Sequence, residues 1–241
     1  MNTTRNLRTT HRTTAILVGV LFIIGTAAGV LSVICLNPIQ YHPEYLVQAA
    51  ENQSRATLGA LAVLAMGLSL AIVPVLMFPI LKRYNETLAL GYVVFRGGLE
   101  TVTYLGMVTC WLVLILLGRE YVQAGAPAAS YFQTMGTLVL GAQDSINTLL
   151  IIIFSLDALM LYTVLYPSKL IPCWISGWGF VAILLHLSTA FVVLLGLADI
   201  NSSIVSIMNL PIFLQEMVMA VWLIVKGFNP STIAAGTAKQ I

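Results

Sequence analysis

The sequence has 241 residues, of which 59% are apolar and only 8% are charged, and its mean hydropathy is +0.95. Soluble globular domains carry about 25% charged residues, so these values exclude that class and indicate an integral membrane protein. The formal net charge of +2 is too small to predict nucleic-acid binding. The chain has no Pro/Ser-rich linker and no low-complexity tract, so we expect a single domain over residues 1–241.

Six apolar segments are long enough to cross a hydrocarbon core, which needs roughly 20 helical residues. They cover residues 15–36, 57–80, 88–117, 145–166, 174–197 and 204–225. The first follows three arginines, but its apolar run is longer than that of a signal peptide, so we expect a transmembrane span there. The predicted fold class is therefore an all-α integral membrane protein with about six transmembrane helices in one bundle.

Lysine and arginine are unequally distributed between the two ends of the predicted spans. One end receives Arg5, Arg8, Arg12, Lys82, Arg83, Lys169, Lys226 and Lys239. The other end receives Arg55 and Arg119. Because cytoplasmic segments of membrane proteins are enriched in these residues, the distribution predicts that both termini face the cytoplasm.

The two longer loops, predicted at 37–56 and 118–144, both belong to the outer side. Residues 125–130 read GAPAAS, which predicts a break, and Ser130 could cap a helix that begins at Tyr131. A single helix over 134–166 would be about 50 Å long, which exceeds the thickness of the hydrocarbon core. We therefore expect a short interfacial helix that ends near Gly141.

Five ionisable residues fall inside the predicted spans, namely Arg96, Glu100, Asp157, His186 and Glu216. At a rise of 1.5 Å per residue, they lie roughly 12 to 18 Å from the predicted cytoplasmic helix ends, which places them in one layer. A charge at the bilayer centre costs about 3 kcal/mol. We therefore expect these side chains to face protein or trapped water.

The spacing of polar residues predicts that they form a buried cluster. Arg96 and Glu100 are four residues apart and can pair on one helix face, which continues through Tyr104. Asn209 and Glu216 are seven residues apart and share one stripe of the last span. The predicted buried polar cluster consists of Arg96, Glu100, Glu216, His186, Asp157, Asn209 and Tyr104.

Two functional hypotheses use this cluster. Carboxylates and a histidine at mid-depth can exchange protons, which favours the binding or translocation of a small solute or of protons. Six spans are few for a secondary transporter, so a homo-oligomer would supply the missing pathway. The alternative is a membrane scaffold or sensor in which the buried charges only fix helix packing.

An intramembrane metal-dependent hydrolase is the weakest hypothesis. Only one of the three histidines, His186, lies in a predicted span, and its spacing from Asp157 and Glu216 matches no known metal-binding motif. The three cysteines show no CxxC spacing, and no nucleotide-binding or hydrolase motif occurs. The sequence therefore predicts no catalytic residue, no cofactor and no metal site.

Three stretches carry a family resemblance: PILKRYNETLALGYVVFRGGLE at 79–100, LYPSKLIPCWISGWG at 165–179 and NLPIFLQEMVMAVWLIVKGFNPS at 209–231. They resemble a bacterial family of multi-pass membrane proteins known as a domain of unknown function, DUF4386, and the resemblance extends over nearly the whole chain. It implies a multi-pass protein of the bacterial cytoplasmic membrane, with no activity or cofactor to carry over. The family pattern matches Arg96, Glu100 and Glu216, and it implies a lower rank for Asp157, where relatives often have a small residue.

Overall fold

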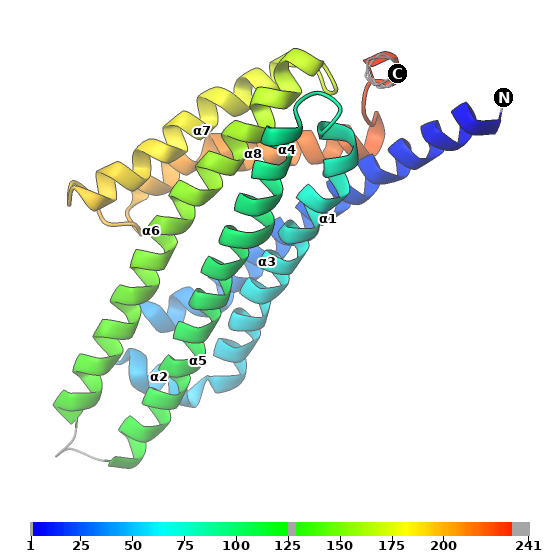
Figure 1. Cartoon of the computed structure of the whole chain (residues 1–241). Coiled ribbons are helices and arrows are strands. Elements are labelled where there is room, and N and C mark those ends of the chain that lie inside the picture. The colour runs from blue at the N-terminus through cyan, green and yellow to red at the C-terminus, as the bar shows by residue number, and fades with distance from the viewer. Residues whose placement is uncertain (1, 125–128, 233–241) are drawn as a thin grey trace. The chain divides into compact units, whose positions relative to one another are not determined.

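The computed structural model describes residues 2–124 and 129–232, and all the regular elements in that part of the chain are helices (Figure 1). These are α1 (Asn2–Gln40), α2 (Tyr45–Glu51), α3 (Gln53–Leu81), α4 (Glu86–Tyr92), the π-helix η1 (Val93–Glu100), α5 (Thr101–Ala124), α6 (Ala129–Ser168), α7 (Cys173–Leu194) and α8 (Ser203–Val225). The predicted all-α class is confirmed.

Six helical stretches in the described residues are long and apolar enough to cross a membrane. They are His11–Gln40, Gln53–Leu81, Glu86–Ala124, Ala129–Ser168, Cys173–Leu194 and Ser203–Val225. Large apolar side chains on these helices, such as Val102, Val181 and Ile207, are more than half exposed. Lipid tails cover such surfaces without the free-energy cost of contact with water. The prediction of a multi-pass membrane protein with six spans is therefore confirmed.

The helices group into two compact units. The first comprises the described parts of Met1–Ile24, Ser69–Glu100 and Leu150–Ile241, and the second comprises Gly25–Leu68 and Thr101–Leu149. The boundaries between units fall inside or at the ends of helices and not in linkers. A single domain over residues 1–241 stays a prediction.

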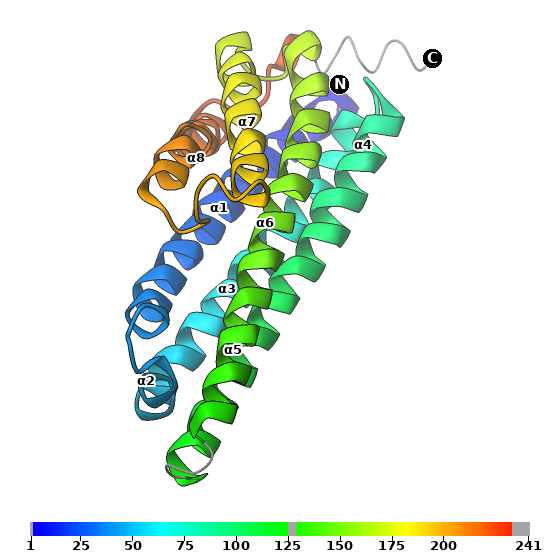
Figure 2. The same cartoon turned by 90° about the vertical axis from the view of Figure 1, so that its left-hand side faces the viewer.

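In the first unit, α7 packs against α8 (Figures 1 and 2), and α1 is tied to the end of α8 by Arg12. The Arg12 guanidinium donates hydrogen bonds to the carbonyl oxygens of Leu223 at 3.1 Å, Ile224 at 2.6 Å and Val225 at 3.2 Å. The last carbonyls of a helix have no partner within the helix, and they form the negative end of its dipole. Arg12 therefore stabilises the α8 C-terminus and joins α1 to it.

In the second unit, the short helix α2 packs against α5. The contact is close at Gly118, because a Cβ atom there would overlap the carbonyl oxygen of Leu46 and lie 3.3 Å from the Ala49 side chain. Tyr45 at the start of α2 also donates a hydrogen bond to the carbonyl oxygen of Gln133 in α6, at 3.0 Å. The predicted loop at 37–56 thus contains a helix, which depends on a glycine for its packing.

We expect Gly118→Ala to lower the temperature of thermal unfolding in detergent. The new methyl group would force α2 and α5 apart, and overpacking of this kind costs roughly 1 to 3 kcal/mol. Gly141→Ala is the matched control, because no atom lies within 4 Å of the position of its Cβ. Alanine in a helix interior is favoured over glycine by about 1 kcal/mol, so the control should be neutral or stabilising. Equal unfolding temperatures for the two variants would contradict this packing.

The interfacial helix predicted to end near Gly141 is wrong, because α6 is continuous over 40 residues, from Ala129 to Ser168. Its length of about 60 Å at 1.5 Å per residue means that the helix extends beyond the hydrocarbon core. The hydroxyl groups along this half of α6 donate to carbonyl oxygens four residues earlier, as seen at Thr134, Thr137, Ser145 and Thr148. These polar side chains are satisfied within the helix, so they require no break.

The start of α6 also differs from the prediction. The helix begins at Ala129, so Ser130 lies inside it and does not cap a helix that begins at Tyr131. The Ser130 carbonyl oxygen instead accepts a hydrogen bond from the Thr134 hydroxyl, at 2.9 Å. The predicted break falls partly on residues 125–128, which lie outside the described residues.

The orientation of the chain stays a prediction that reporter fusions can test. A fusion after Lys82 or at the C-terminus should show the activity of a cytoplasmic reporter, because lysine and arginine concentrate at that end of the spans. A fusion after Tyr121 should show the activity of a reporter that works only outside the cytoplasm. The reverse pattern would contradict the predicted topology. One residue used for the prediction, Lys239, lies outside the described residues.

Candidate functional site

The stretch FRGGLE at 95–100 lies in the π-helix η1, between α4 and α5. A π-helix forms hydrogen bonds between residues five apart, and such segments often occur at functional sites. Gly98 has no atom within 4 Å of the position of a Cβ, and Gly97 would make only ordinary contacts, 3.6 Å from Ala71 O and from Pro74. Close packing therefore requires neither glycine. Glycine has a low α-helix propensity, and the pair weakens the preference of this segment for an α-helix.

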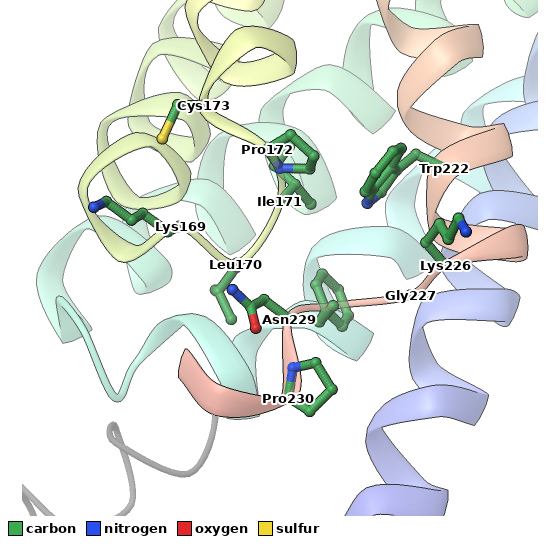
Figure 3. A pocket seen from close by; sticks show the side chains of 11 residues that line it. Lys169, Leu170, Ile171, Pro172, Cys173, Trp222, Lys226, Gly227, Asn229 and Pro230 are labelled. Carbon is green, nitrogen blue, oxygen red and sulfur yellow. The ribbon is translucent and has the colours of Figure 1, made fainter.

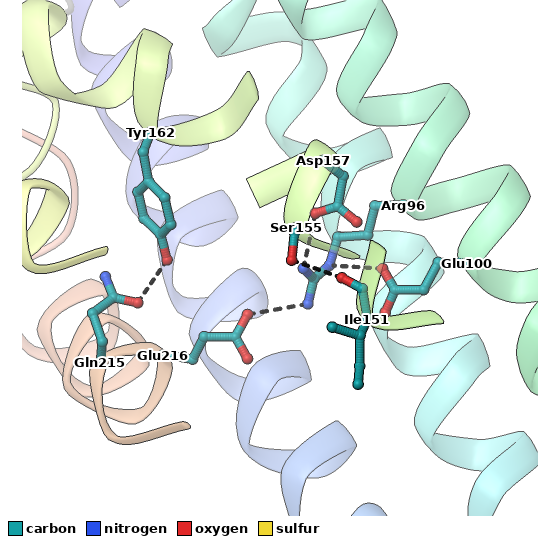
Figure 4. A network of polar contacts seen from close by, with 8 residues as sticks. All are labelled: Arg96, Glu100, Ile151, Ser155, Asp157, Tyr162, Gln215 and Glu216. Atoms are coloured by element: carbon teal, nitrogen blue, oxygen red, sulfur yellow. Dashed lines mark hydrogen bonds and ion pairs between the residues drawn. The ribbon is translucent and has the colours of Figure 1, made fainter. Parts of the chain in front are cut away.

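Arg96 is the centre of a group of charged side chains in the first unit (Figure 4). Its Nη1 donates to Asp157 Oδ1 at 3.2 Å, and its Nη2 donates to Glu216 Oε1 at 3.3 Å. Its Nε lies 4.0 Å from Glu100 Oε2. Arg96 is 1% exposed, and Glu216 is the most exposed of its three partners at 16%. We call Arg96, Glu100, Asp157 and Glu216 the Arg96 cluster.

Two aromatic rings cover the guanidinium of Arg96. Its Cζ lies 5.2 Å from the ring centroid of Phe22 and 5.1 Å from that of Phe154. Both distances are within the range of cation–π attraction. The rings belong to α1 and α6, so Arg96 contacts α1, α6 and α8 at once. The apolar cover also lowers the local dielectric constant, which strengthens every interaction between the charges inside it.

The charges of the Arg96 cluster do not balance if every group is ionised. One guanidinium and three carboxylates give +1 − 3 = −2. The carboxyls of Asp157 and Glu100 are fully buried, and both lie beside the guanidinium of Arg96. Asp157 Oδ2 is buried without a hydrogen-bond donor among the described residues. Ionised carboxylates have only acceptor atoms, so two of them cannot form a hydrogen bond to each other. A proton bound to one carboxylate would make it a donor.

His186 and Asn209 form a second polar group. His186 Nδ1 donates to Asn209 Oδ1 at 2.8 Å, and the Thr189 hydroxyl donates to the same oxygen at 3.3 Å. The His186 ring meets the Phe154 ring edge-on, with centroids 5.1 Å apart. Because Phe154 also stacks on Arg96, this ring contacts both polar groups. The predicted cluster is thus divided into two groups, and no ion pair joins His186 to the carboxyls in the part of the chain that the structure describes.

Two other predicted site residues differ from expectation. Tyr104 belongs to the second unit, where its ring covers Gly67 at 2.8 Å from the position of a Cβ. Asp157, which the family resemblance ranks below the other acidic residues, makes the shortest of the three ion pairs with Arg96. Asp157 is therefore as much a part of the Arg96 cluster as Glu100 and Glu216 are.

Sequence reasoning missed three polar residues beside the Arg96 cluster. Tyr92 is completely buried, and its hydroxyl has no hydrogen-bond partner among the described residues. It precedes Arg96 by four residues, so the spacing rule that pairs Arg96 with Glu100 would also have found it. Tyr162 donates to Gln215 Oε1 at 2.6 Å, and both side chains are buried. Because these residues are uncharged, a search for charges inside spans passes over them.

The three carboxyls of the cluster face a guanidinium and not a shared empty centre (Figure 4). Across residues 2–124 and 129–232, no three His, Cys, Asp or Glu side chains are grouped as metal ligands. The chemistry that this arrangement can support is the holding and transfer of protons.

Comparison with known proteins gives a family but no function. A family model described as a domain of unknown function, DUF4386, matches residues 17–227. Neither a curated protein nor a solved structure matches the chain. The matched range includes all four residues of the Arg96 cluster and covers most of the 241 residues. The chain therefore belongs to the DUF4386 family.

Proposed function

We propose that the Arg96 cluster binds a proton. By binding and releasing protons there, the protein moves protons or a small solute across the bacterial cytoplasmic membrane. The observation that carries the proposal is the presence of three carboxyls around one buried guanidinium. An ionised carboxylate without a compensating charge costs several kcal/mol in a protein interior. Binding a proton between Asp157 and Glu100 removes part of this cost.

The partial exposure of Glu216 supports exchange of the proton. Its side chain is 16% exposed, whereas the other two carboxyls are fully buried. Arg96 contacts all three, so a proton that reaches Glu216 would change the charge that Arg96 must balance at Asp157. Glu216 is therefore the proposed entry point, and the pair of Asp157 and Glu100 is the proposed binding site.

The π-helix supports a change of conformation linked to the proton. Conversion of η1 into an α-helix would rotate Arg96 about the helix axis, because the two helix types differ in the number of residues per turn. Such a rotation would change the distances from Arg96 to Asp157 and Glu216. Gly97 and Gly98 would permit it, because glycine adopts a wider range of backbone dihedral angles than other residues.

A scaffold is the alternative function, and the contacts of Arg96 with three other helices favour it. A buried ion pair can fix the register of helices without taking part in any chemistry. The two functions differ in one prediction. A scaffold tolerates the loss of proton exchange if the helices still pack, whereas a translocation site does not.

Asp157→Asn tests the proposal in liposomes that contain the purified chain and a pH-sensitive dye. Under an imposed membrane potential, we expect the wild-type chain to acidify the lumen faster than protein-free liposomes do. The introduced amide would resemble a carboxylic acid that cannot release its proton, so the variant should be folded but inactive. Asp199→Asn, in an exposed loop, is the control and should be active. A wild-type rate equal to that of empty liposomes, or an active Asp157→Asn variant, would contradict translocation.

A further inference from the structure

A second site lies away from the Arg96 cluster, at the end of the first unit where α6 turns into α7. A cavity of about 380 Å³ opens between this turn and the residues that follow α8 (Figure 3). The backbone N–H of Asn229 donates to the carbonyl oxygen of Leu170 at 2.9 Å, which holds the two walls together. The volume is within the range of small-molecule sites, about 300 to 1,000 Å³.

Two lysines line the cavity from opposite sides (Figure 3). Lys169 lies in the turn and has a φ of 54°, and Lys226 follows the last residue of α8. In the described residues, neither ammonium group forms an ion pair or a hydrogen bond. Both side chains are exposed at the rim of the cavity, and their ammonium groups point away from it in Figure 3, so each lysine binds an anionic ligand only after its side chain turns inward.

The start of α7 adds to the positive potential of this cavity. Pro172 and Cys173 line it, and Pro172 is the N-cap of the 22-residue helix α7, without a side-chain cap. The first N–H groups of a helix have no partner within the helix, and they attract anions, phosphate in particular. The two lysines and the N-terminus of α7 therefore both favour the binding of an anion.

The other walls are apolar and include Trp222, Phe228 and Leu170. Tryptophan is common where a membrane meets water, because its ring has an apolar body and a polar N–H group. Basic pockets between helices on the cytoplasmic side of membrane proteins bind the headgroups of anionic lipids. The distribution of lysine and arginine predicts that this end of the spans faces the cytoplasm.

We infer that this cavity binds a phosphate group, carried either by the headgroup of an anionic phospholipid or by a small soluble phosphate ester. The lysines Lys169 and Lys226 bind the phosphate oxygens together with the α7 N-terminus. The apolar wall at Trp222 and Phe228 contacts the carbon atoms next to the phosphate. This site is independent of proton binding at the Arg96 cluster.

Native mass spectrometry of the full chain in detergent tests the inference. We expect one molecule of phosphatidylglycerol to stay bound to the wild-type chain, and we expect Lys169→Gln with Lys226→Gln to weaken its binding by roughly 10- to 30-fold. Lys82→Gln with Arg83→Gln is the matched control, because it also removes two positive charges from the same end of the spans but neither residue lines the cavity. Its affinity should equal that of the wild-type chain.

Glycerol 3-phosphate and inorganic phosphate, added in place of the lipid, distinguish the two sources of the phosphate group. Binding of glycerol 3-phosphate that the double variant loses would assign the cavity to a soluble ester, and binding of the lipid alone would assign it to a headgroup. Unchanged binding of both ligands in the double variant, or no binding of either to the wild-type chain, would overturn the inference. An equal loss in Lys82→Gln with Arg83→Gln would also overturn it, because the effect would then be one of overall charge.

Discussion

Arg96→Met is expected to destabilise the protein by about 3 to 5 kcal/mol, the typical cost of removing one partner from a buried ion pair. Methionine preserves much of the volume between Phe22 and Phe154 but leaves three carboxyls, two of them fully buried, without their cation. The free energy of unfolding in mild detergent measures the effect. Arg119→Met, at an exposed position, is the matched control and should change stability by less than about 0.5 kcal/mol.

The same variant should be sensitive to pH. Without Arg96, no cation balances the carboxylates of the cluster, so we expect the folded chain to take up protons there that the unfolded chain releases. Stability falls with rising pH wherever the folded state binds more protons than the unfolded state. The loss of stability in Arg96→Met should therefore be smaller at about pH 6 than at about pH 8. If the loss of stability is the same at both pH values, the cluster takes up no protons when Arg96 is removed, which would contradict this expectation.

Asp157→Asn and Asp157→Leu should differ strongly, although both remove the negative charge. Asparagine has one acceptor and one donor group, so it can accept from Arg96 Nη1 and still offer an N–H group to a neighbouring carboxylate, as a protonated Asp157 would. We expect its stability to lie within about 1 kcal/mol of the wild-type value. Leucine makes neither hydrogen bond and leaves buried polar atoms without a partner, so it should cost about 3 kcal/mol or more.

The comparison decides whether a proton is part of the folded cluster. If Asp157 were ionised and shared no proton with Glu100, Asp157→Asn would remove an ion pair of Arg96 and cost nearly as much as Asp157→Leu. Thermal unfolding of both variants beside the wild-type chain supplies the measurement. Similar large losses for both variants would contradict proton binding at this position.

Much of the fold follows from the sequence because the bilayer restricts what the chain can do. A span needs about 20 apolar residues, and polar backbone groups must be satisfied inside the span, so long apolar segments form helices. The predicted pairing partners Glu100 and Glu216 both lie beside Arg96, at 4.0 and 3.3 Å. Helical spacing and shared depth were enough to predict that these three side chains meet.

Other features depend on packing that one sequence does not show. The π-helix has no recognised sequence pattern, and the glycines at 97 and 98 weaken an α-helix without indicating which other structure forms. Helical spacing aligned Tyr104 with Arg96 and Glu100, but contacts assign Tyr104 to a different unit. His186 is predicted to lie in the same layer as Arg96, but its ring meets Phe154 and its Nδ1 bonds to Asn209. The depth of a residue in its span and its spacing along the helix predict which layer and which helix face it occupies. Which side chains it contacts within that layer depends on the shapes of the side chains.

The most direct test of proton binding is infrared spectroscopy of the wild-type chain in lipid at neutral pH. A proton held between Asp157 and Glu100 should give the carbonyl stretching band of a protonated carboxylic acid, and the band should shift to lower wavenumber in D2O as the proton exchanges through Glu216. The band should disappear in Asp157→Asn and stay unchanged in Asp199→Asn. A wild-type spectrum without such a band, or a band that survives in Asp157→Asn, would contradict the central claim that the Arg96 cluster binds a proton at Asp157.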